Sequence, residues 1–88
     1  MITEEEGTAA IKKIAAECQH IIRAEGFPNA ECTGHFMVGL TVPDHAGVKL
    51  NAGGLLHAVR INPDNLFDPE MPKKGADLLL NWLRGKQH

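Results

Sequence analysis

The first part of the chain has apolar residues at intervals of three and four, a spacing typical of one face of an α-helix. Thr3 and Glu6 have the spacing of a capping box, in which each side chain bonds the backbone N–H of the other residue. Gly26 and Pro28 predict the helix end, since glycine commonly caps a helix and proline cannot extend it. We therefore expect a long helix over residues 3–25. Its core-facing stripe is predicted to be Ile11, Ile14, Ala15, Cys18, Ile21 and Ile22.

The middle of the chain changes to a period of two, which is the repeat of a half-buried strand. Turn-forming residues at 43–47 and 51–54 divide this region and favour tight connections between antiparallel neighbours. The predicted strands are residues 35–42, 48–51 and 55–61. Their predicted core-facing residues are Phe36, Val38, Leu40, Val42, Val48, Leu50, Leu55, Val59 and Ile61. We expect a three-stranded antiparallel meander.

The last part of the chain combines a proline-rich loop with a second amphipathic helix. Three prolines within residues 62–72 predict an ordered loop. The loop residues expected to pin it to the core are Leu66, Phe67 and Met71. Pro72 suits the first turn of a closing helix, and Gly85 predicts its end. The predicted stripe of this helix is Ala76, Leu79, Leu80 and Leu83, widened by Leu78 and Trp82. The pattern predicts a single α+β domain over residues 1–88, a two-layer sandwich of order α-β-β-β-α.

Charge is distributed unevenly along the chain. Nine Lys+Arg and eleven Asp+Glu give a net charge of −2, which provides no broad attraction for nucleic acid or an anionic membrane. Within residues 32–61 the charged residues are Asp44, Lys49 and Arg60 alone. The second face of the predicted sheet is therefore weakly charged, and an exposed apolar surface of this kind marks an interaction site. The predicted partner contacts are Met37, Gly39, Leu56, Ala58 and Arg60.

Two arrangements of the helices fit this pattern. The helices either cover opposite faces of the sheet, or share one face and leave the other for a second copy or a partner protein. We favour the second, because small domains often complete a small core by forming symmetric dimers. The first or third strand would also offer an edge for pairing. The predicted function is a non-enzymatic binding or regulatory protein, a homodimer acting through this face.

Catalytic motifs are absent from the sequence, which contains neither serine nor tyrosine. Strand parity places His57 on the apolar face, where a structural histidine with a hydrogen-bond partner is the ordinary case. The alternative is a small-ligand site or an enzyme using His57 beside Phe67. A further alternative is a nucleophile and base formed by Cys32 and His35.

The cysteines fit reduced thiols, since the two do not form a C-x-x-C pair. Cys18 lies on the helix stripe and is expected to be a small buried hydrophobe. The spacings Cys18-x-His20 and Cys32-x-x-His35 do not fit a zinc site, because residues two apart on a helix point in different directions. We therefore predict no metal and no cofactor.

The predicted element order is also that of the double-stranded RNA-binding domain. The residues that resemble this family are Phe36, Val38 and Leu40, similar to its first strand, and Lys73, Lys74 and Ala76, similar to its Lys-Lys-x-Ala helix start. The resemblance implies an RNA-binding module. Its phosphate contacts would be Lys73, Lys74 and Arg84. Eleven residues separate the third strand from the lysine pair, where the family has a short run, so RNA binding is the alternative function.

The chain begins with an acidic segment where a secretory signal would have a basic stretch and an apolar run. Its longest unbroken run of large aliphatic residues is Leu78, Leu79 and Leu80, far short of the roughly 20 residues of a membrane-spanning helix. These features predict a cytoplasmic protein without a membrane segment. Its expected partner is a second copy of itself or another protein.

Overall fold

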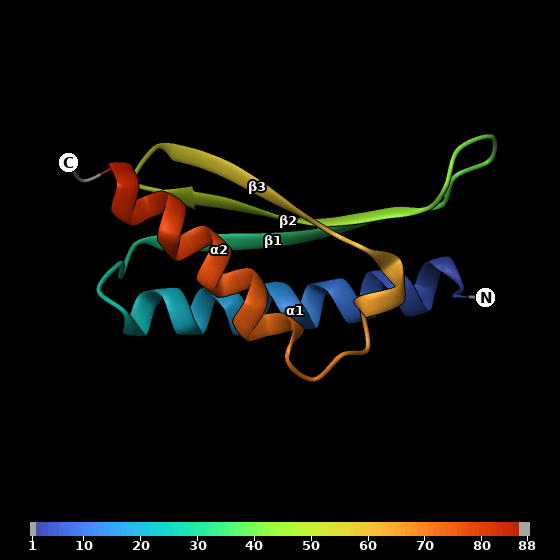
Figure 1. Cartoon of the computed structure of the whole chain (residues 1–88), viewed down its shortest axis with the longest axis horizontal. Helices are drawn as coiled ribbons and strands as arrows, with labels where there is room; N and C mark the ends of the chain where they lie inside the picture. The colour runs from blue at the N-terminus through green and yellow to red at the C-terminus, as the bar shows by residue number, and fades with distance from the viewer. Residues whose placement is uncertain (1, 87–88) are drawn as a thin grey trace.

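The computed structural model describes residues 2–86 and has the element order α-β-β-β-α (Figure 1). The elements are α1 (Glu4–Ala24), β1 (Ala30–Met37), β2 (His45–Ala52), β3 (Leu55–Ile61), a short 3-10 helix η1 (Pro63–Asn65) and α2 (Met71–Lys86). The strands form one antiparallel sheet in the order β1-β2-β3. The predicted fold class is confirmed: a three-stranded meander packed against a long first helix and a shorter last helix.

Helix α1 has both predicted ends. The Thr3 hydroxyl accepts a hydrogen bond from the backbone N–H of Glu6 at 3.1 Å, and Glu6 Oε1 accepts one from the backbone N–H of Thr3 at 3.3 Å. Gly26 follows the helix with a φ of 107°, a left-handed conformation that glycine adopts without steric strain. The capping box and the glycine cap are therefore confirmed.

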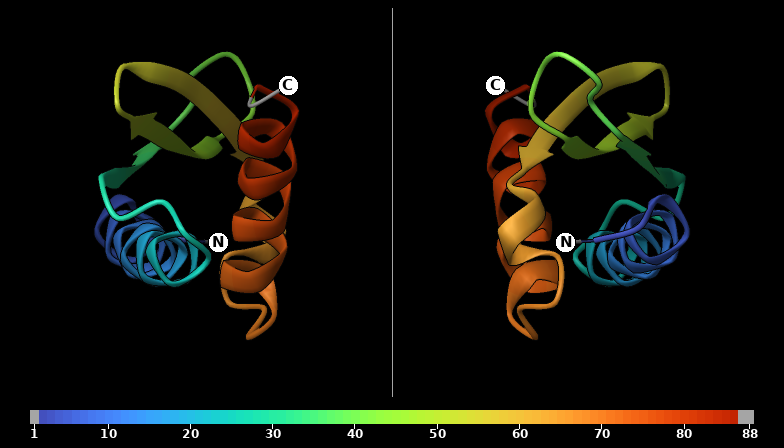
Figure 2. Two further views of the ribbon diagram at one scale, coloured as in Figure 1. Left: turned by 90° about the vertical axis from the view of Figure 1, so that its left-hand side faces the viewer. Right: turned by 90° about the vertical axis from the view of Figure 1, so that its right-hand side faces the viewer.

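Both helices lie on the same side of the sheet (Figure 2). Helix α1 packs along β1 and reaches β2, whereas α2 packs against α1 and β3. The side chains between the two layers form the core. The sheet contributes Ala30, Phe36, Ala46, Val48, Leu50, Val59 and Ile61 to this core. Of the two arrangements that the sequence allowed, the structure has the one in which the helices share a face.

The position predicted for the first strand is wrong, because β1 spans Ala30–Met37 and not residues 35–42. The inner side of β1 lies so close to α1 that a Cβ added at Gly34 would be 2.5 Å from the carbonyl oxygen of Ile11. Only small side chains fit against α1 there, so this part of the strand lacks the large apolar residues that mark a strand in a sequence. The residues wrongly placed on the core face, and found exposed after β1, are Val38, Leu40 and Val42.

The second strand is longer than predicted, because Gly47 lies inside β2 and not in a turn. Strand β2 turns into β3 through Gly53 and Gly54, whose φ angles of 61° and 92° suit a two-residue hairpin. Asn51 Oδ1 accepts a hydrogen bond from the backbone N–H of Gly54 at 3.1 Å and closes this turn. Strand β3 (Leu55–Ile61) has the predicted bounds. Leu55, predicted to face the core, is partly exposed at the start of the strand.

The segment between β3 and α2 is an ordered loop, as predicted. Leu66 and Met71 are buried and attach the loop to the core, but Phe67 is 62% exposed, so its predicted core role is wrong. Within α2 the predicted stripe is buried, whereas Leu78 points away from the core. Gly85 lies inside the helix and does not end it.

Candidate interaction surface

The face of the sheet that points away from both helices, here called the outer face, is left open by residues 2–86. It is formed by alternate residues of all three strands, as the continuous antiparallel register requires. The outer-face residues with side chains are Glu31, Thr33, His35 and Met37 of β1, His45, Lys49 and Asn51 of β2, and Leu56, Ala58 and Arg60 of β3. Polar and apolar groups are mixed on it, with one acid and two permanent bases.

Three of the predicted contact residues lie together on β3. Leu56, Ala58 and Arg60 are exposed on its outer face, with Leu56 70% exposed. Met37 is 55% exposed but lies at the far end of β1, on the opposite edge of the sheet. Gly39 is not on the sheet, because it lies in the loop after β1, so its predicted place on the sheet face is wrong. The structure therefore concentrates the predicted contacts along β3.

The middle of the outer face is closed by His35, whose ring lies over Gly47. A Cβ added at Gly47 would be 2.7 Å from Cε1 of His35, so the ring occupies the space that a side chain would take. His45 meets this ring edge to face, with 6.4 Å between the ring centroids. Partial burial lowers the pKa of His35, and the nearby charges of Lys49 and His45 lower it further. A lowered pKa favours the neutral ring at neutral pH.

A second exposed apolar group lies at the loop of residues 38–44, which projects beyond β1 and β2 (Figure 1). We call Val38, Leu40 and Val42 the apolar tip; Leu40 is 98% exposed. The backbone N–H of Gly39 donates to Asp44 Oδ1 at 2.8 Å, which ties the two ends of the loop together. Sequence reasoning missed this surface because the alternation continues past the end of β1. The nearby Gly39 and Pro43 were the available signals of a loop.

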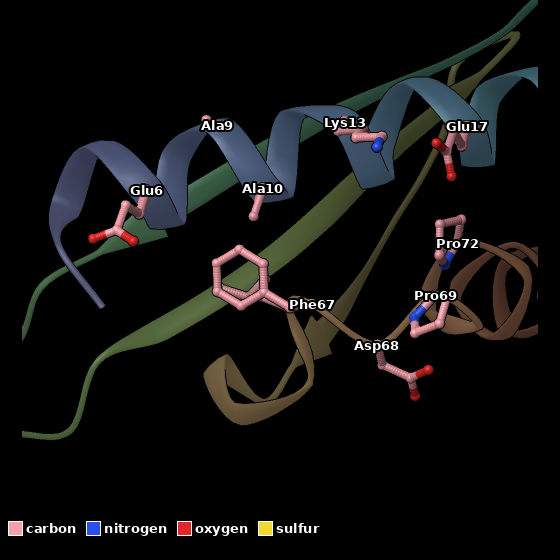
Figure 3. Close-up of a pocket in the computed structure, with 10 residues that line it drawn as sticks. Glu6, Ala9, Ala10, Lys13, Glu17, Phe67, Asp68, Pro69 and Pro72 are labelled. Carbon is pink, nitrogen blue, oxygen red and sulfur yellow. The ribbon is translucent and has the colours of Figure 1, made fainter. Parts of the chain in front are cut away.

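A groove lies between α1 and the loop that precedes α2 (Figure 3). Ala9 and Ala10 of α1 are among its lining residues, and the ring of Phe67 faces Ala10 from the other side. The charged residues around it are Glu6, Lys13, Glu17 and Asp68. Histidine and cysteine are absent from its lining within residues 2–86.

His57 does not join Phe67 in one site, so the predicted pairing of these residues is wrong. The His57 ring stacks on Trp82 of α2 with centroids 4.4 Å apart and 1° between the ring planes. The Nζ atom of Lys86 lies 5.6 Å from the centroid of the Trp82 ring. His57 is half-buried in this stack, whereas Phe67 lines the groove beside α1. This arrangement joins β3 to α2 and gives His57 a packing role.

The two cysteines are free and lie on the inner side of the molecule. The Cys18 thiol donates a hydrogen bond to the carbonyl oxygen of Pro72 at 3.2 Å, and burial raises its pKa to about 12. Burial also raises the pKa of Cys32, which faces α1. Cys32 and His35 lie on opposite faces of β1, so they cannot act as nucleophile and base. Among residues 2–86, no three His, Cys, Asp or Glu side chains gather as metal ligands.

Two of the three cations considered for RNA binding are already paired with acids. Lys74 Nζ lies 3.0 Å from Asp68 Oδ2, and an Arg84 nitrogen lies 3.5 Å from Glu25 Oε1. The residues that resembled the first strand of the RNA-binding family do not form one strand, since β1 ends at Met37. The geometry therefore gives RNA binding no support.

No family model, curated protein or solved structure matches the chain. In the part of the chain that the structure describes, neither helix combines the length and hydropathy needed to cross a bilayer. The outer face, the apolar tip and the groove are therefore interpreted from their own chemistry.

Proposed function

We propose that the protein is a small non-enzymatic binding domain that acts as a homodimer through the outer face of its sheet. One observation carries the proposal. Both helices lie on the inner face, and the outer face keeps Leu56 exposed on β3 in a strip with Ala58 and Arg60. Arginine is enriched in protein interfaces, whose centres are otherwise poor in charged residues, and Arg60 is the single charge of this strip.

The size of the domain supports self-association. A chain of this length buries a smaller fraction of its surface than a larger domain, so its core contributes little stability. A twofold dimer covers the same strip on both copies and adds apolar contact without lengthening the chain. In this proposal the homodimer binds through this surface without a catalytic step of its own.

The oligomeric state tests this proposal. Analytical ultracentrifugation over a wide range of protein concentration should give twice the 9.6 kDa mass of one chain. Leu56→Arg should dissociate the dimer, because it places a second cation in the strip that already contains Arg60. Leu78→Arg is the matched control, since Leu78 is also an exposed leucine but lies on α2. A wild-type protein of monomer mass at every concentration would exclude the proposal, as would equal effects of the two variants.

A further inference from the structure

The two edge strands of the sheet, β1 and β3, differ in whether other parts of the chain bond their outward backbone groups. On the free edge of β1, the backbone N–H of Cys32 donates to Gln19 Oε1 at 3.0 Å. On the same edge, Arg23 Nε donates to the carbonyl oxygen of Ala30 at 2.8 Å. Both partners are side chains of α1, so the helix occupies backbone groups that another strand would need.

These two bonds also fix the direction of the backbone groups across the sheet. In an antiparallel ladder the N–H and C=O of one residue point to the same neighbouring strand, and successive residues alternate. The backbone N–H of Cys32 points away from β2. The register therefore directs the backbone groups of Leu50 and His57 toward each other. The residues of β3 whose N–H and C=O point out of the sheet are then Leu56, Ala58 and Arg60.

The free edge of β3 has one charged residue, Arg60, but lacks other features that usually protect a sheet edge. Within residues 2–86, no hydrogen bond reaches the outward backbone groups of Leu56, Ala58 or Arg60. The strand contains no proline, and its register with β2 is continuous, so no bulge turns it away. An edge of this kind is a template for another strand.

We propose that the β3 edge pairs antiparallel with β3 of a second copy, across a twofold axis at Ala58, to form a six-stranded sheet. This inference rests on the proposed homodimer and places its contact at the β3 edge, where the strip of Leu56, Ala58 and Arg60 borders the outer face, so that the two outer faces lie side by side in one sheet instead of stacking. Centring the register on Ala58 places Leu56 opposite Arg60 of the second copy. All three outward residues of each copy then pair, giving about six backbone hydrogen bonds, more than any shifted twofold register allows.

The side chains suit a second copy in this register. Ala58 is small, so two copies approach closely at the axis without a clash. Each Arg60 faces a leucine, so no like charges lie directly opposite each other. Lys49 neighbours Ala58 in the sheet, which leaves the two Lys49 residues three strand spacings apart, about 14 Å and beyond the screening length of about 10 Å at moderate salt. The paired sheet joins the two outer faces into one surface.

Disulfide trapping tests the register directly. Ala58→Cys, in a Cys32→Ala background, should give a covalent dimer under mild oxidation, because opposed residues of this type lie about 5.5 Å apart at Cα. Thr33→Cys is the matched control, since Thr33 is exposed in the same row of the outer face but on the opposite edge. A covalent dimer from Ala58→Cys alone supports the inference. Equal trapping of both variants, or of neither, overturns it.

Charge substitutions at Leu56 separate this inference from the proposed function. Edge pairing places position 56 opposite Arg60 of the second copy, so Leu56→Asp should keep the dimer while Leu56→Arg weakens it at least tenfold. Stacking of two outer faces instead predicts that both variants dissociate. Dissociation of both variants, together with the absence of a disulfide-linked dimer of Ala58→Cys, overturns the edge pairing. The proposed homodimer itself would still stand. A monomeric wild-type protein overturns both.

Discussion

The ring of Phe36 lies in the space where a side chain at Gly7 would project. A Cβ added at Gly7 would be 2.7 Å from three carbons of this ring. Both residues are buried, Gly7 in the second turn of α1 and Phe36 near the end of β1. The glycine lets the helix approach the strand, and the ring fills the space that it leaves.

We expect Gly7→Ala to destabilise the protein, although alanine normally stabilises a helix by about 1 kcal/mol relative to glycine. The added methyl group must displace the Phe36 ring, which typically costs about 1–3 kcal/mol in a packed core. Urea denaturation measures the free energy of unfolding. Gly85→Ala is the control, because Gly85 lies in α2 with open space around its Cα, and this variant should be neutral or more stable. Similar gains from both substitutions would contradict the packing argument.

Large parts of the fold could be predicted because their signals are local. The capping residues Thr3 and Glu6 fix the start of α1, and Gly53 and Gly54 fix the start of β3. Strand β1 could not be placed, because the requirement for Gly34 comes from the backbone of Ile11 in another element. The inner side of this part of β1 has small residues that allow close approach to a helix, so it lacks the large apolar residues that mark a strand.

The candidate surface was predictable only where the strand boundaries were correct. Leu56, Ala58 and Arg60 have the predicted outward orientation because β3 begins and ends as predicted. Gly39 was misplaced together with the strand that was thought to contain it. The role of α1 in occupying the β1 edge depends on Gln19 and Arg23, which lie outside the predicted apolar stripe of the helix.

Stability should fall at alkaline pH because of Cys18. Burial raises the pKa of this thiol from 9.0 to about 12, so the folded protein holds a proton that the unfolded chain releases above pH 9. The contribution of the protonated Cys18 thiol to the free energy of unfolding is complete below pH 9 and is lost as the pH rises toward 12. One such group changes the free energy of unfolding by at most about 1.4 kcal/mol per pH unit.

Cys18→Ala should reduce this alkaline dependence. Urea denaturation of both proteins at several pH values from 9 upward measures the slope of the unfolding free energy. The variant also loses the hydrogen bond to Pro72, so its stability at neutral pH should be lower, but the slope is independent of that offset. Identical slopes for the two proteins would show that Cys18 is not the titrating group.

His35 should make the stability of the protein fall at acidic pH, whereas Cys18 makes it fall at alkaline pH. Its pKa is lowered from 6.5, first by partial burial and then by the charges of Lys49 and His45. The unfolded chain therefore binds a proton more readily than the folded protein, so stability is present above pH 6.5 and falls as the pH decreases through the lowered pKa. His35→Gln should flatten this decrease, as measured by thermal unfolding across the mildly acidic range. A variant that keeps the wild-type decrease would assign it to other groups.

Neighbouring residues of the 38–44 loop should respond in opposite ways to substitution. A Cβ at Gly39 would overlap the carbonyl oxygen of Val42, so Gly39→Ala must rearrange the loop, and we expect the hydrogen bond to Asp44 to be lost. We expect this variant to lose about 1–3 kcal/mol of stability.

Leu40 is almost fully exposed, so Leu40→Ser should change the free energy of unfolding by less than about 0.5 kcal/mol. Urea denaturation of the two variants makes the comparison, and sedimentation of Leu40→Ser should still give a dimer because Leu40 lies in the loop and not in the β3 strip of Leu56, Ala58 and Arg60. A large loss of stability in Leu40→Ser would mean that the tip packs against the domain.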